Sequence, residues 1–103
     1  TAISGSGPAY IFLMAELMIK EGIKAGLKAE EANLLAKHTI LGAGELMISS
    51  DLKPDKLREN VSSPGGTTQA ALLHLMEKEN GLPRIVSNAI NAAIQRSKQL
   101  RKI

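Results

Sequence analysis

The fold is decided by the stretch Pro8-Ala9-Tyr10-Ile11-Phe12-Leu13-Met14-Ala15-Glu16-Leu17-Met18-Ile19-Lys20-Glu21-Gly22. Proline suits the first helical position, and from Ala9 to Ile19 only Glu16 is charged. A helix that is apolar nearly all round is buried on nearly every side. Because a chain of 103 residues has few places to bury such a helix, we expect an obligate homodimer or higher homo-oligomer with interleaved helices.

The next segment reads as a second long helix, separated from the first by Gly22 and Gly26. It spans about residues 28 to 48, and Gly42 and Gly44 inside it each cost roughly 1 kcal/mol of helix propensity relative to Ala. These glycines either permit a close helix–helix approach or are merely tolerated. One face of this helix carries Leu35, Thr39, Gly42, Ala43 and Leu46 at helical spacing.

The rest of the chain also reads as helix. A short helix starts at Pro54, and another follows Thr68 and ends near Asn80-Gly81, where Gly81 is a suitable left-handed stop. Pro83 opens the last helix, whose apolar stripe consists of Val86, Ile90, Ala93, Ser97 and Leu100. No segment alternates in the manner of a strand. We therefore predict one all-α domain over residues 1–103, a helical bundle of about five helices.

Composition excludes several classes of function. Cysteine is absent, and the two histidines, His38 and His74, lack the spacing of metal ligands, so we expect neither thiol chemistry nor a metal site. The net charge of +3 is dispersed, which argues against nucleic-acid binding. The longest apolar run, residues 8–15, is too short to span a membrane, and no signal-peptide pattern is visible. We expect a cytoplasmic location.

The one stretch that does not read as helix is Ser62-Ser63-Pro64-Gly65-Gly66-Thr67-Thr68. Gly65 and Gly66 permit positive φ and a close approach of another molecule, and a helix follows at once. Free N–H groups and the positive end of a helix dipole then make a site for a phosphate or carboxylate. From the residues alone, a helix cap preceded by a Pro-Gly turn explains the same pattern.

Three motifs resemble the C-terminal domain of pyrroline-5-carboxylate reductase. They are Ser4-Gly5-Ser6-Gly7-Pro8-Ala9-Tyr10, Asn60-Val61-Ser62-Ser63-Pro64-Gly65-Gly66-Thr67-Thr68 and Arg96-Ser97-Lys98-Gln99-Leu100. The resemblance covers essentially the whole chain in order, and the second motif is the specific one. The family also has an N-terminal Rossmann domain, which is missing here; the chain starts at Thr1 without an initiating Met, as part of a longer protein would.

The resemblance implies reduction of the C=N bond of 1-pyrroline-5-carboxylate to L-proline, the last step of proline biosynthesis. Hydride would come from NADPH or NADH, bound mainly by the missing domain, so we expect no cofactor site here and no activity of this piece alone. The resemblance further implies that Ser63, Gly65, Gly66 and Thr67 bind the substrate carboxylate. Thr68 would bind the substrate and act catalytically, its hydroxyl orienting the ring nitrogen or relaying a proton.

Two alternatives stay open beside this function. The first is a purely structural helical oligomerisation module without a ligand site, in which the loop before Gln69 is only a turn. The second is a small nucleic-acid binder, which only the basic charge suggests. No other catalytic constellation is visible in the sequence. Gly5-Ser6-Gly7 precedes a helix but follows no strand, so it is a weak dinucleotide-binding motif.

Overall fold

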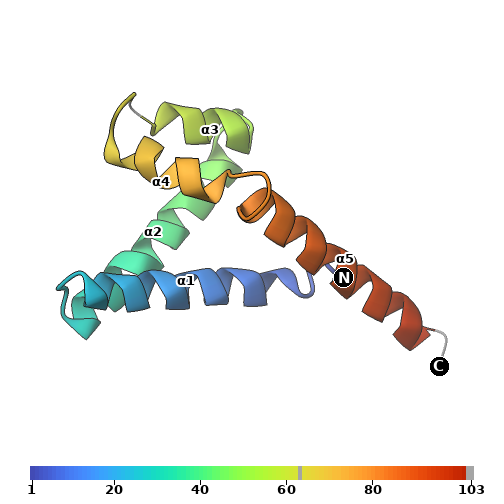
Figure 1. Ribbon diagram of the computed structural model, residues 1–103. Helices are drawn as coiled ribbons and strands as arrows, with labels where there is room; N and C mark the ends of the chain where they lie inside the picture. Colours follow the sequence, from blue (N-terminus) through green and yellow to red (C-terminus); the bar gives the residue numbers. More distant parts are fainter. Residues whose placement is uncertain (63, 102–103) are drawn as a thin grey trace. The chain divides into compact units, whose positions relative to one another are not determined.

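Helices make up most of the described chain. The computed structural model describes residues 1–62 and 64–101, and within them it contains five helices and no strand (Figure 1). The helices are α1 (Gly7–Lys24), α2 (Ala29–Ser49), α3 (Pro54–Asn60), α4 (Thr67–Leu75) and α5 (Leu82–Arg101). The prediction of an all-α chain with about five helices is confirmed.

The helices belong to two compact units. One unit spans residues 8–57 and holds α2, most of α1 and the start of α3. The other combines residues 1–7 with the chain from Arg58 onward, and it holds α4 and α5. The loop that precedes α4 lies wholly in the second unit.

The first unit is built on the turn between α1 and α2, where Figure 1 shows the two long helices meeting. Gly26 has φ +114°, the Leu27 N–H donates to the Gly22 carbonyl at 3.0 Å, and the Gly26 N–H donates to the Ile23 carbonyl at 3.0 Å. These two bonds around a left-handed glycine form a Schellman motif, which satisfies the last carbonyls of a helix. Of the two glycines expected to separate the helices, Gly26 lies at the end of α1, whereas Gly22 lies inside it.

Small residues bring the two long helices together beside this turn. Ala32 and Ala36 of α2 are buried, and a Cβ placed on Gly22 of α1 would lie 3.4 Å from the Ala32 Cβ. Leu35 and Leu46, on the face predicted for this helix, are 57% and 48% exposed within one copy. The periodicity selected the larger apolar residues, whereas the packed contact within one copy of the chain uses alanine.

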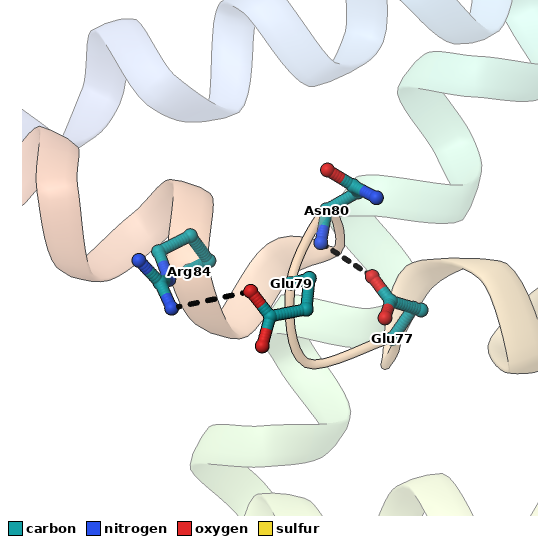
Figure 2. A network of polar contacts seen from close by, with 4 residues as sticks. All are labelled: Glu77, Glu79, Asn80 and Arg84. Atoms are coloured by element: carbon teal, nitrogen blue, oxygen red, sulfur yellow. Dashed lines mark hydrogen bonds and ion pairs between the residues drawn. The ribbon is translucent and has the colours of Figure 1, made fainter.

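The α4–α5 connection differs from its prediction. The helix expected to reach Asn80-Gly81 ends at Leu75, because a loop forms in which the Glu77 carboxylate accepts a hydrogen bond from the Asn80 N–H (Figure 2). The same view shows an ion pair between Arg84 of α5 and Glu79, with 3.6 Å between Nη2 and Oε2. Both acidic side chains thus make local polar contacts in the α4–α5 connection.

Gly81 closes this loop by close packing, not by a left-handed backbone. Among the described residues, only Gly26 and Gly65 have positive φ, so the expected left-handed stop at Gly81 is wrong. Gly81 is buried, and a Cβ there would lie 2.6 Å from the Leu75 carbonyl oxygen and closer still to that of Glu77. Only glycine fits, because these neighbours are backbone atoms.

A single copy of the chain has almost no hydrophobic core. The buried hydrophobic residues among those described are Ala2, Ala32 and Ala36, all of them small. Large apolar side chains lie at the surface of α1, including Phe12 at 71% and Ile11 at 50% exposure. The apolar surface that the sequence places in a core is therefore not buried within one copy.

Candidate functional site: the loop before α4

The loop leads directly into the first turn of α4. Gly66 is the N-cap residue, with φ −89° and ψ −178°, and its carbonyl accepts the first helical hydrogen bond from the Ala70 N–H at 3.1 Å. The first turn contains no acidic residue. N–H groups at a helix start and the positive end of its dipole attract an anion, and here no carboxylate of the first turn opposes that attraction.

Gly65 and Gly66 take different conformations. Gly65 has φ +74°, the left-handed region that favours glycine, while Gly66 is extended. A Cβ built on Gly65 would have no neighbouring atom within 4 Å among the described residues, so the loop is open on that side. The sequence analysis allowed positive φ at both glycines, and only Gly65 uses it.

The structure brings four of the five predicted site residues together, since they are consecutive from Gly65 to Thr68. Thr67 opens α4 and is exposed, whereas Thr68 is half-buried. The fifth, Ser63, lies outside the described residues. The predicted transition from loop to helix at these residues is confirmed, and their role in binding stays a prediction.

Gln69 was not among the predicted site residues, yet its side chain reaches the loop. Its Oε1 accepts a hydrogen bond from the Gly65 N–H. Gln69 is the third residue after the N-cap, the position from which Glu or Gln reaches back in a capping box. Glutamine at this position signals a side chain that can reach back, but a capping box would use the N–H of the N-cap Gly66, whereas Gln69 accepts from the N–H one residue earlier.

A groove runs from this loop along α4 inside the same unit. The groove is lined by the polar residues Arg58, Glu59, Ser62 and Gln69 and by the apolar residues Leu72, Leu73 and Met76. The Ser62 hydroxyl donates to the Arg58 carbonyl at 2.8 Å, which ties the start of the loop to the end of α3. A small polar molecule with an apolar face would find both kinds of surface here.

Two searches of residues 1–62 and 64–101 bear on other kinds of site. No three His, Cys, Asp or Glu side chains gather there in a way that could hold a metal ion. None of the helices in that part of the chain is both long and apolar enough to cross a membrane.

Sequence comparison assigns the whole described chain to one family. A family model described as pyrroline-5-carboxylate reductase dimerisation matches residues 1–100. Pyrroline-5-carboxylate reductase of Pseudomonas aeruginosa is 47% identical over 100 residues, and that of Pisum sativum is 44% identical over 100 residues. In both cases the match covers 97% of this chain and 36% of the relative, so the chain spans about a third of the length of these relatives.

Solved structures agree with this result. A pyrroline carboxylate reductase of Plasmodium falciparum, determined with NADP bound, matches with a TM-score of 0.88 and 41% identity, covering 96% of this chain and 38% of that one. The Streptococcus pyogenes 1-pyrroline-5-carboxylate reductase matches with a TM-score of 0.89 and 36% identity, with the same coverage. The resemblance deduced from the three sequence motifs is confirmed.

Proposed function

The chain belongs to the pyrroline-5-carboxylate reductase dimerisation family, and we propose that it is the C-terminal part of such a reductase. The proposed enzyme reduces the C=N bond of 1-pyrroline-5-carboxylate to give L-proline, as a cytoplasmic enzyme of proline biosynthesis. Within it, residues 1–103 supply dimerisation and the substrate carboxylate site. The observation that carries the proposal is the coincidence of a family match with an open glycine loop at a helix N-terminus.

The hydride would come from NADPH or NADH, bound mainly by an N-terminal domain of the longer enzyme. The Plasmodium falciparum relative carries NADP, which supports this cofactor class. The described residues of this chain do not fit the nucleotide themselves, because a dinucleotide fold needs a glycine-rich turn between a strand and a helix, and they contain no strand. The cofactor's own chemistry is hydride transfer, and this chain orients the acceptor.

We assign the substrate carboxylate to the N–H groups of the loop and the first turn of α4. Gly65, Gly66 and Thr67 present their backbone there, and Ser63, outside the described residues, is proposed to add its hydroxyl. Three features support the assignment: the left-handed Gly65, the open space beside it, and a first turn free of acidic side chains. Holding one end of a small ring in this way fixes its position for reaction.

The Thr68 hydroxyl is proposed to face the ring nitrogen. A threonine hydroxyl is both donor and acceptor, so it can hydrogen-bond the nitrogen before and after reduction. It does not titrate near neutral pH, and its role is therefore to orient the ring or to relay a proton. Its position one residue after Thr67 puts it on the same helical turn as the proposed carboxylate donors.

We further propose that the chain forms an interleaved homodimer, or a larger assembly of such dimers. The proposal is supported by the exposed apolar side chains of α1 and by the absence of a core within one copy. The competing function is a purely structural oligomerisation module, in which the loop before α4 is only a cap and a turn. No nucleic acid or membrane partner is proposed.

Steady-state kinetics of the longer enzyme test the site. Thr68→Ala should lower kcat more than it raises KM, because a hydrogen bond to the reacting nitrogen matters most as its charge changes. The expected loss in kcat/KM corresponds to about 1–3 kcal/mol, the cost of one lost hydrogen bond at a polar site.

Thr39→Ala is the matched control, since Thr39 is an α2 threonine whose hydroxyl donates to the Leu35 carbonyl at 2.6 Å. It should leave both constants within about twofold of the parent. The structural alternative is favoured instead if Thr68→Ala also stays within about twofold.

A further inference from the structure

The Gly65 N–H is already engaged in the structure. It donates to Oε1 of Gln69, a side-chain oxygen from the first turn of α4. A carboxamide oxygen is an acceptor of the same geometry as one oxygen of a carboxylate, but it carries no full charge. The Gln69 side chain therefore stands where an oxygen of a bound carboxylate would accept the same hydrogen.

We propose that Gln69 is an internal competitor for the carboxylate site, which must release the Gly65 N–H before that amide can bind the substrate. The inference rests on the proposed function, because it concerns the same carboxylate site. An N–H with one hydrogen makes one good hydrogen bond, so the two acceptors exclude each other at Gly65. The substrate carboxylate wins this exchange because a charge-assisted hydrogen bond is stronger than a neutral one.

The surroundings allow Gln69 to leave. Gln69 is exposed, and its side chain lines the groove that runs along α4, so the released carboxamide has open space beside it. Arg58 and Ser62 line the same groove and supply polar surface for the carboxamide. Until it leaves, the Gln69 carboxamide occupies the Gly65 N–H.

The variants Gln69→Ala and Gln69→Glu separate competition from a merely structural cap. Gln69→Ala should lower KM for pyrroline-5-carboxylate and the inhibition constant of L-proline by about two- to tenfold, the range of one net hydrogen bond, with kcat unchanged. Gln69→Glu should raise both constants, because an ionised carboxylate is a stronger acceptor and repels the substrate. Yet Gln69→Glu should not lower Tm, since an acidic residue in the first turn stabilises a helix.

Two controls isolate the effect. Gln95→Ala, at an exposed glutamine of α5, should leave KM and the inhibition constants of L-proline and pyrrolidine unchanged. Pyrrolidine, which lacks the carboxylate, should inhibit the Gln69 variants and the parent equally. The inference is overturned if Gln69→Ala raises KM or leaves it unchanged, or if it shifts inhibition by pyrrolidine as much as inhibition by L-proline.

Failure of the proposed function gives a different result. In that case the parent and every variant would neither reduce pyrroline-5-carboxylate nor bind L-proline. If instead the parent is active and Gln69→Ala fails to tighten binding, only the competitor role is wrong.

Discussion

Gly65 and Gly66 are neighbours in the same loop, but a side chain would have different effects at the two positions. Gly65 has φ +74°, which a side chain with a Cβ opposes, whereas the extended backbone of Gly66 is open to any residue. Both glycines border the surface to which we assign the substrate carboxylate. A side chain at either position would stand in the path of the carboxylate, but only a side chain at Gly65 would also distort the backbone.

Valine at each position should therefore separate binding from stability. Gly65→Val and Gly66→Val should both raise KM in the longer enzyme, because a branched side chain blocks access to the N–H groups. Only Gly65→Val should also lower the free energy of unfolding, by about 1–2 kcal/mol, the cost of a left-handed backbone for a residue with a Cβ. Steady-state kinetics and thermal melts on the same preparations measure the two effects.

Gly65→Asn is the matched control, since asparagine adopts the left-handed region more readily than valine. It should recover most of the stability that Gly65→Val loses. The assignment of the carboxylate would be contradicted by normal KM values in both valine variants.

At the scale of helices and loops, small residues determine where elements of the chain pack closely. Ala32 and Ala36 are covered by α1 near Gly22, and Gly81 is enclosed by backbone atoms of the α4–α5 loop. A Cβ added at Gly42 or Gly44 of α2 would meet no atom within 4 Å in the described part of the chain. No other element therefore approaches these glycines closely within one copy. A close approach there is left to a second copy.

Gly81→Ala should destabilise the fold by about 1–3 kcal/mol, the usual cost of overpacking, because the added Cβ would meet the Leu75 and Glu77 backbone. Gly22→Ala is the control, since its Cβ would lie 3.3 Å from Cδ1 of the Leu27 side chain and 3.4 Å from the Ala32 Cβ, and alanine is the better helix former. Chemical denaturation of both variants measures the difference. Equal stability of the two would refute the close packing at Gly81.

The sequence predicted those elements whose boundaries are set by local chemistry. The short helix opened by Pro54 and the helix end at Gly26 were found because proline and glycine act on their own backbone. The end of α4 was missed because residues 76–80 carry no breaker, and the helix stops where Glu77 bonds the Asn80 N–H. The Gln69 contact was missed because it depends on how a side chain reaches back to the loop, which the order of residues alone does not specify.

At the scale of the whole molecule, large apolar side chains lie at the surface of one copy. Phe12 and Leu13 of α1, both more than half exposed, belong to the run that the sequence analysis identified as too apolar for a surface helix.

Association with a second copy is the explanation that matches the family of this chain. The interface should bury on the order of 2,000 Å² or more, the size of an obligate one. Such an interface would also cover the glycines of α2 that nothing approaches within one copy. Folding and assembly should then be a single event that depends on protein concentration.

Sedimentation of the purified chain at micromolar concentration, with helix content followed by circular dichroism on the same samples, tests this account most directly. We expect a homodimer or a larger assembly of dimers at every concentration at which the chain is helical. Dilution far enough to dissociate it should also abolish the helical signal. A stable monomer with full helix content and a cooperative thermal transition would contradict the account.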